Sequence, residues 1–214
     1  MNTLHMALIV GVVLTNLASL GSSRLRACIT IIGVQGVLVS MLPLLGGAHV
    51  TWTVVLFALV NGAVKGGLIP WLLRRALQVS GTRSELDPFV SYTMALLLGV
   101  AALGAASWLS TRLPFAGRHL AQYVAPMAFH TMLIGLLLVI VRRTALSQIL
   151  GYLTLENGIF AFGALFAVKE PWLVQLGVLL DLLAGVFVMG IALFHISRTF
   201  DHIDTVKLSA LKDQ

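Results

Sequence analysis

Residues 151–166 read GYLTLENGIFAFGALF, a largely apolar run with one carboxylate, Glu156, near its middle. A helix that crosses the hydrocarbon core of a membrane takes about 20 residues, most of them apolar. A charged side chain at the centre of such a helix costs about 2.5 to 3.5 kcal/mol on insertion scales. The stretch therefore predicts a membrane helix in which Glu156 either pairs with another polar group or has a function.

The composition of the whole chain also indicates a membrane protein. Of its 214 residues 58% are hydrophobic and 10% are charged, and the mean hydropathy is +0.98. Soluble domains are normally about a quarter charged. We predict an all-α, multi-pass protein with about seven membrane helices, the first retained as a helix because no basic leader precedes it. The seven runs are 4–21, 27–46, 51–73, 88–110, 121–141, 146–167 and 172–195.

The basic residues predict the orientation of these helices. If the N-terminus is outside, one set of ten basic residues falls on the inner side: Arg24, Arg26, Arg74, Arg75, Arg83, Arg142, Arg143, Arg198, Lys207 and Lys212. The outer side then holds three: Arg112, Arg118 and Lys169. This bias follows the positive-inside rule, so the C-terminal tail is expected in the cytoplasm. Short basic loops suit lipid headgroups, and no nucleic-acid surface is indicated.

Cofactor chemistry is not indicated for this chain. Its sole cysteine, Cys28, cannot form an internal disulfide or hold an iron–sulfur cluster. A b-type haem needs two facing histidines at one depth, and His130 alone falls near mid-membrane. Nucleotide-binding and hydrolase motifs are absent from the sequence. We expect no cofactor, metal or catalytic residue in this chain.

The two ends of the chain resemble each other in plan. Each has a helix, a short basic turn, a helix with a mid-run polar residue, and another helix with a mid-run charge. Gln35 then corresponds to Glu156, and Lys65 takes the place of Asp181. This pattern predicts a parallel repeat of three helices: residues 1–80 form one unit, 81–118 a linking helix with its loops, and 119–214 the second unit.

Three ionisable residues fall at similar depth. Glu156 is about 14 residues, roughly 20 Å, beyond Arg142, which places it near the midplane, and Asp181 and Lys65 reach a comparable level. Burial favours their neutral forms, and a nearby opposite charge favours the ionised forms. Such groups exchange protons readily, although a static buried ion pair is the alternative. His130 is expected either to relay protons or to bond a neighbouring backbone.

The second half resembles the K subunit of bacterial complex I, on the basic turn "VRRTALS", the helix with Glu156, the helix with Asp181 and the tail "DTVKLSALK". The whole chain is similar to component E of hydrogenase 4. The stretches "ILGYLTLENG", "LLDLLAGVFVMGIAL" and "NGAVKGGLIPWLLRRA" carry that resemblance. It implies roles in proton relay or coupling for Glu156, Asp181, Lys65 and His130.

The resemblance also implies a setting. The chain would be a non-catalytic, proton-conducting subunit of an energy-converting hydrogenase of the formate hydrogenlyase type, in a prokaryotic cytoplasmic membrane. Nickel–iron and iron–sulfur centres would lie in soluble partners, and antiporter-like and other complex I-like subunits would flank this one. A K-like subunit of a complex I-type dehydrogenase or of a multisubunit cation/proton antiporter is an alternative. A stand-alone small solute transporter is another.

The charge distribution generates a topology prediction. Reporter fusions after Gln78 and after Gln214 are expected in the cytoplasm, and a fusion after Pro114 outside, because the basic loops stay on the inner side. Paired phosphatase and fluorescent-protein reporters measure this directly. An external signal after Gln78 would rule out the parallel repeat.

Overall fold

The computed structural model describes residues 3–45, 51–79, 89–113, 121–142, 144–164 and 190. In this part of the chain all regular structure is helical, as the composition predicts. The elements are α1 (Thr3–Gly21), α2 (Leu25–Ser40), the 3-10 turn η1 (Leu42–Leu45), α3 (Trp52–Ala63), the π-helical segment η2 (Val64–Leu68), α4 (Ile69–Val79), α5 (Tyr92–Thr111), α6 (Ala121–Val141) and α7 (Ala145–Ala164).

Five helical stretches of the described residues are long and apolar enough to cross a membrane. They are Thr3–Gly21, Leu25–Leu44, Trp52–Gln78, Tyr92–Thr111 and Ala121–Val141, and they coincide with the first five predicted runs. The chain is thus a multi-pass membrane protein. Helix α7 covers the sixth predicted run and has 20 residues, but Gln148, Glu156 and Asn157 make it more polar. The seventh predicted run, 172–195, lies outside the described residues apart from residue 190.

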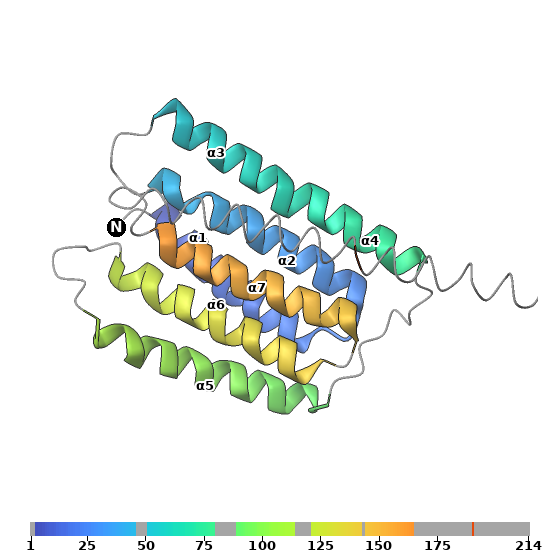
Figure 1. Ribbon diagram of the computed structural model, residues 1–214. Coiled ribbons are helices and arrows are strands. Elements are labelled where there is room, and N and C mark those ends of the chain that lie inside the picture. Colours follow the sequence, from blue (N-terminus) through green and yellow to red (C-terminus); the bar gives the residue numbers. More distant parts are fainter. Residues whose placement is uncertain are drawn as a thin grey trace, which may run out of the picture.

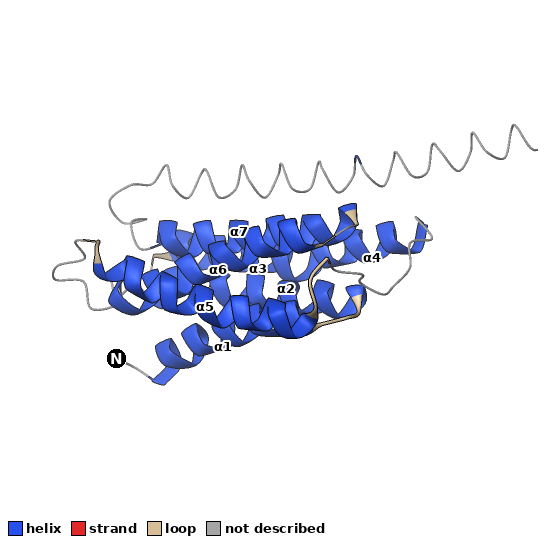
Figure 2. Cartoon of the chain, turned by 90° about the horizontal axis from the view of Figure 1, so that it is seen from below, coloured by secondary structure: helices blue, strands red, loops and turns tan. Residues whose placement is uncertain are grey.

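The helices lie side by side and alternate in direction along the chain (Figure 1). The continuous helix α3–η2–α4 forms one edge and α5 the opposite edge, with α2, α1, α7 and α6 between them, and Figure 2 shows the same array from below. Five of the six arginines in the described residues gather at one end, which we call the basic end: Arg24, Arg26, Arg74, Arg75 and Arg142. This clustering agrees with the charge bias of the sequence.

The buried Arg142 closes the basic end. Its guanidinium donates hydrogen bonds to the carbonyl oxygens of Ser19 at 3.0 Å and of Ser22 at 3.3 Å. These carbonyls belong to the last turn of α1 and the residues after it, where helix carbonyls lack partners within the helix. The positive charge also suits the negative end of the α1 dipole. Arg142 thereby ties the end of α6 to the end of α1.

Helices α6 and α7 are in backbone contact through glycines. A Cβ added at Gly151 would lie 2.6 Å from the Val139 backbone nitrogen, and one at Gly158 would lie 2.7 Å from that of Met132. A Cβ at Gly135 would be closer still to Leu155. Because such contacts do not occur between real atoms, a side chain at any of these positions would push the two helices apart. We call Gly135, Gly151 and Gly158 the glycine seam.

The π-helical segment keeps one face of the third membrane stretch turned inward. From Asn61 to Leu73 the buried stripe of this stretch repeats at every fourth residue: Asn61, Lys65, Ile69 and Leu73. In a regular α-helix of about 100° per residue, that spacing would rotate the stripe by roughly 120° over these residues. A π-helical turn takes up an additional residue and reduces this rotation. The distortion lies where Lys65 has to face α2.

The glycine seam generates a stability prediction. Gly135→Ala and Gly151→Ala are expected to destabilise the protein by about 1 to 3 kcal/mol, because each added methyl meets backbone atoms. Thermal unfolding of the purified protein in mild detergent measures the effect. Gly104→Ala on α5 is the matched control, since a Cβ there meets nothing within 4 Å. Equal melting temperatures for the three variants would contradict the seam.

Candidate functional site

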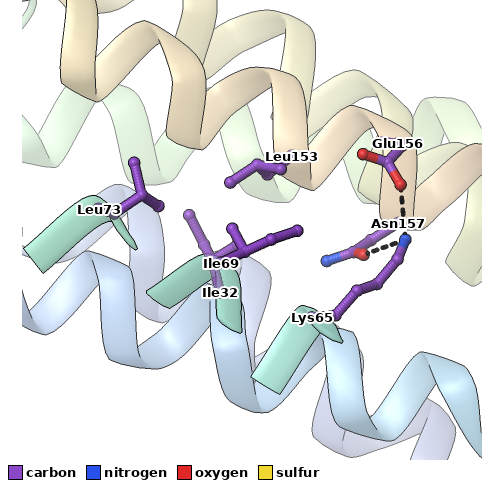
Figure 3. Close-up of a pocket in the computed structure, with 7 residues that line it drawn as sticks. All are labelled: Ile32, Lys65, Ile69, Leu73, Leu153, Glu156 and Asn157. Atoms are coloured by element: carbon purple, nitrogen blue, oxygen red, sulfur yellow. Dashed lines mark hydrogen bonds and ion pairs between the residues drawn. The ribbon is translucent and has the colours of Figure 1, made fainter. Parts of the chain in front are cut away.

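The centre of the candidate site is an ion pair between η2 and α7. The Lys65 ammonium donates to Glu156 Oε1 at 2.7 Å and to Asn157 Oδ1 at 3.1 Å (Figure 3). The side chains of Lys65 and Glu156 are 4% and 2% exposed. The Phe160 ring lies one helical turn along α7, with its centroid 5.1 Å from Lys65 Nζ, a cation–π distance. A buried ion pair, which the sequence analysis gave as the alternative to proton exchange, is therefore present, and the exchange role stays a prediction.

Local packing brings Lys65 close to α2. A Cβ added at Gly36 would lie 2.7 Å from the Lys65 Cβ, so the contact requires glycine at this position. One helical turn along, a Cβ at Gly33 would lie 2.8 Å from the ring of Pro70. The two glycines of α2 let the η2–α4 boundary approach, and the lysine stem crosses the interface to reach α7. Its charge is consequently surrounded by protein.

The ion pair continues into a chain of buried hydrogen bonds across the bundle. Asn157 Nδ2 donates to Gln35 Oε1 at 3.1 Å, and Gln35 Nε2 donates to Asn16 Oδ1 at 2.7 Å. Asn16 Nδ2 in turn contacts His130 Nδ1 at 3.2 Å and donates to Thr131 Oγ1 at 2.9 Å. His130 Nε2 lies 3.2 Å from the Gly99 carbonyl oxygen of α5. Side chains of α7, α2, α1 and α6 are thus linked in sequence.

These polar residues lie between hydrophobic clusters. On α2 and α7, Gln35 and Glu156 separate a cluster that includes Ile32 and Leu153 from one that includes Val39 and Phe160. On α6, His130 separates that second cluster from a third near α5. We call the set the polar layer: Asn16, Gln35, Lys65, His130, Thr131, Glu156 and Asn157. All seven residues are buried, so their hydrogen bonds must be made within the protein.

A small cavity adjoins the ion pair on the side of the basic end. Its volume is about 10 Å³, and its lining consists of Ile32, Lys65, Ile69, Leu73, Leu153, Glu156 and Asn157 (Figure 3). Space of this order is the lower limit for one water molecule, which also needs polar partners. Lys65, Glu156 and Asn157 supply such groups at one end of the cavity, whereas its remaining walls are aliphatic.

The structure joins three of the four predicted site residues in one network. Lys65 and Glu156 form the ion pair, and His130 lies at the far end of the hydrogen-bond chain. The expectation that His130 bonds a neighbouring backbone is confirmed at Gly99, and its relay role stays a prediction. The fourth residue, Asp181, lies outside the described residues.

Sequence reasoning did not find the uncharged links of this network. Gln35 was noted only as a feature of the repeat, and Asn16, Thr131 and Asn157 were not identified. An amide in the middle of an apolar run was the available signal, because such a group needs hydrogen-bond partners inside the membrane. Which partners it finds depends on helix packing, which the sequence pattern does not specify.

No metal centre is formed by the part of the chain that the structure describes: no three histidine, cysteine, aspartate or glutamate side chains gather there. Cys28 is buried, and its thiol lies 3.7 Å from the Ser19 carbonyl oxygen. The ionisable side chains of the polar layer are Lys65, Glu156 and His130, residue types whose side chains can exchange protons.

Comparison with known proteins places the second half of the chain. Residues 123–213 match the family described as NADH-ubiquinone/plastoquinone oxidoreductase chain 4L. The chain is 29% identical over 205 residues to the uncharacterized protein Rv0085 of Mycobacterium tuberculosis, and the aligned region covers 95% of this chain and 93% of that protein. The chain is also 40% identical over 80 residues to Hydrogenase-4 component E of Escherichia coli K12, where the aligned region covers 37% of each chain. No solved structure shows a significant match.

Fold and site together define a multi-pass membrane protein with a buried layer of ionisable and amide side chains. Its residues 123–213 match the chain 4L family, the family of the complex I K subunit. The predicted resemblance to that subunit and to Hydrogenase-4 component E is confirmed. The matched region contains His130 and Glu156, whereas Lys65 lies outside it, on the continuous α3–η2–α4 helix.

The buried ion pair generates a second stability prediction. Lys65→Met is expected to destabilise the protein by about 3 kcal/mol or more, because Glu156 keeps its carboxylate without the cation. The double variant Lys65→Met with Glu156→Leu is expected to recover much of that loss, since neither charge remains. Thermal unfolding in mild detergent measures both. Thr154→Val on α7 is the control, because its hydroxyl bonds only the Leu150 carbonyl. Additive losses in the double variant would contradict a coupled pair.

Proposed function

We propose that this chain is a proton-coupling membrane subunit of a complex I-related, energy-converting [NiFe]-hydrogenase complex of the formate hydrogenlyase type. The observation that carries the proposal is the Lys65–Glu156 pair, 2.7 Å apart and buried in the polar layer. The match of residues 123–213 to chain 4L and the likeness to Hydrogenase-4 component E support the kind of assembly.

The ion pair suits proton exchange. A proton that moves from the Lys65 ammonium to Glu156 Oε1 converts two charges into two neutral groups over one hydrogen bond. Burial stabilises the neutral pair, whereas mutual attraction and the hydrogen bond from Lys65 to Asn157 stabilise the charged pair. A modest change in the surrounding field therefore shifts the balance between the two states. A change in the charge of a nearby group in a partner subunit would supply that change in field.

The setting follows from the same proposal. The protein lies in a prokaryotic cytoplasmic membrane with its basic end at the cytoplasm. Antiporter-like and other complex I-like membrane subunits flank it, and the soluble hydrogenase module with its nickel–iron and iron–sulfur centres acts at a distance. Asp181 is proposed as a second acid of the proton path. This chain itself is a non-catalytic subunit of the oxidoreductase complex.

A complex I-type dehydrogenase is the second candidate for the assembly, and the chain 4L match favours it. Purification in mild detergent distinguishes the two. Copurification of a nickel–iron subunit supports the hydrogenase, whereas a flavin-containing module that oxidises NADH supports the dehydrogenase. A stable homo-oligomer with solute uptake would instead indicate a transporter.

The proposal generates a prediction for Glu156→Gln. The new amide oxygen still accepts a hydrogen bond from Lys65 Nζ, so the complex is expected to assemble and its soluble module to react with artificial electron acceptors. Proton translocation is expected to fall at least tenfold, because the amide cannot bind and release a proton at neutral pH. Proton pumping in reconstituted vesicles, normalised to assembled complex, measures this.

Two further variants complete the design. Asp181→Asn is expected to assemble normally and to lose proton pumping in the same way. If both acids serve one path, the double variant is expected to lose little more pumping than the more affected single variant. Thr154→Val, a buried polar change on the same helix as Glu156, is expected to pump normally. Pumping at the wild-type rate per complex in Glu156→Gln would refute a proton-coupling role.

A further inference from the structure

The hydrogen-bond chain of the polar layer has a fixed direction. At one end, the Lys65 ammonium has only hydrogen atoms to offer, so Asn157 must present its oxygen to it. At the other end, the Gly99 carbonyl has only lone pairs, so His130 Nε2 must carry the hydrogen. Between these ends, the amides of Asn157, Gln35 and Asn16 each accept through oxygen on the Lys65 side and donate through nitrogen on the His130 side.

This direction determines the state of His130. Asn16 Nδ2 donates to Nδ1, and Nε2–H donates to the Gly99 oxygen, so the ring is neutral with its proton on Nε2. Thr131 agrees with the assignment: its hydroxyl donates to the Met127 carbonyl at 2.8 Å and accepts from Asn16 Nδ2. A charged Lys65 at one end is thereby matched to a neutral histidine at the other.

Protonation of His130 requires the opposite direction. An imidazolium donates from both nitrogens, so Asn16 has to turn its oxygen toward Nδ1. Gln35 and Asn157 then have to turn as well, because otherwise two oxygens or two NH₂ groups would face each other. The reversed Asn157 points its NH₂ at Lys65 Nζ, where an ammonium has no lone pair to accept it. A neutral Lys65 amine has one lone pair, so Lys65 has to release a proton, and Glu156 Oε1, 2.7 Å away, accepts it. The amine then turns its lone pair to the Asn157 NH₂ and donates an N–H to the Glu156 carboxyl group.

We propose that Asn16, Gln35 and Asn157 couple the charge of His130 to the charge state of the Lys65–Glu156 pair. A proton that binds His130 Nδ1 from outside the layer reverses the three amides, and the Lys65 proton moves to Glu156. One proton enters, one moves within the pair, and no proton passes through the amides. This inference deepens the proposed function and rests on it for one point, that the coupling serves proton translocation. The coupling between His130 and the Lys65–Glu156 pair is itself a property of this chain. It is reciprocal, so the charge state of the pair also changes the proton affinity of His130.

Direct electrostatic repulsion between His130 and Lys65 is a competing explanation for coupling between the two ends of the hydrogen-bond chain. His130 meets Asn16 from α1 and the Gly99 carbonyl from α5, and no ionisable side chain of the described residues is bonded to it. Lys65 meets Glu156, Asn157 and the Phe160 ring from α7, and Gly36 from α2. Two positive charges in a low-dielectric interior also repel each other through space. An experiment must separate that repulsion from coupling through the amides.

A double-mutant cycle on His130 titration makes the separation. The full chain, labelled with nitrogen-15 in its histidines, is reconstituted in lipid vesicles, and His130 is assigned by comparison with His130→Gln. Nitrogen chemical shifts report the tautomer and the extent of protonation against pH. The cycle comprises wild type, Lys65→Met, Gln35→Leu and the double variant. Gln35→Met serves as a second chain-breaking variant if Gln35→Leu folds poorly, and Ser40→Ala is the matched control on α2, since Ser40 bonds only the Gly36 carbonyl.

The expected results are specific to the chain. Wild-type His130 carries its proton on Nε2, and Lys65→Met increases its proton affinity about tenfold, within the usual range of coupling between sites. With Gln35→Leu or Gln35→Met the Lys65→Met effect disappears, and with Ser40→Ala it remains. An equal Lys65→Met effect with and without Gln35 would show repulsion through space alone and overturn the inference. A proton on Nδ1 in the wild type, or no Lys65→Met effect at all, would also overturn it.

These outcomes are distinct from those that test the proposed function. If Glu156→Gln abolishes pumping while the Lys65→Met effect is independent of Gln35, the proposed function stands and the amide coupling fails. If Glu156→Gln pumps at the wild-type rate while the cycle shows coupling through Gln35, the linkage is real but serves another purpose.

Discussion

The structure depends on one requirement, that the Lys65 ammonium find its acceptors inside the protein. In a membrane interior neither water nor lipid tails supply them, so the oxygens of Glu156 and Asn157 do. This requirement determines several features that are unrelated in sequence. Gly36 admits the lysine stem, the π-helical segment directs it toward α7, and α7 carries an acid and an amide side by side. Replacing any of these features leaves a buried charge without its partners.

Amides rather than further charges extend this interaction across the bundle. Each amide offers an acceptor and a donor without a net charge, so Asn157, Gln35 and Asn16 connect four helices without adding a further charge to the Lys65–Glu156 pair. Hydrophobic clusters lie on both sides of this layer, and such apolar surroundings strengthen its hydrogen bonds. The layer is consequently a structural tie between these helices, and it is the path along which the proposed coupling acts.

The sequence predicted those parts of the structure that follow from hydrophobicity and charge alone. Run length and composition identified the first five membrane stretches. The cost of a mid-membrane charge singled out Lys65, Glu156 and Asp181 at one depth, and the structure pairs the first two. The links through Asn16 and Asn157 depend on which helix faces lie against each other, and single-helix patterns do not contain that information. The π-helical segment is a local change in helical period, which run length and composition do not reveal. Asp181 and the proposed repeat of residues 1–80 and 119–214 stay predictions.

The π-helical segment has a consequence for how related chains diverge. Loss of one residue within Val64–Leu68 that restored a regular helix would leave α4 facing nearly as it does now, because the π-helical turn already takes up the additional residue. Ile69 and Leu73 would keep their places against α2. Loss of one residue in the regular part of α3 or α4 would instead turn the rest of the helix by about 100°. A lineage that keeps the lysine is therefore freer to vary in length at this point than in the regular helix on either side.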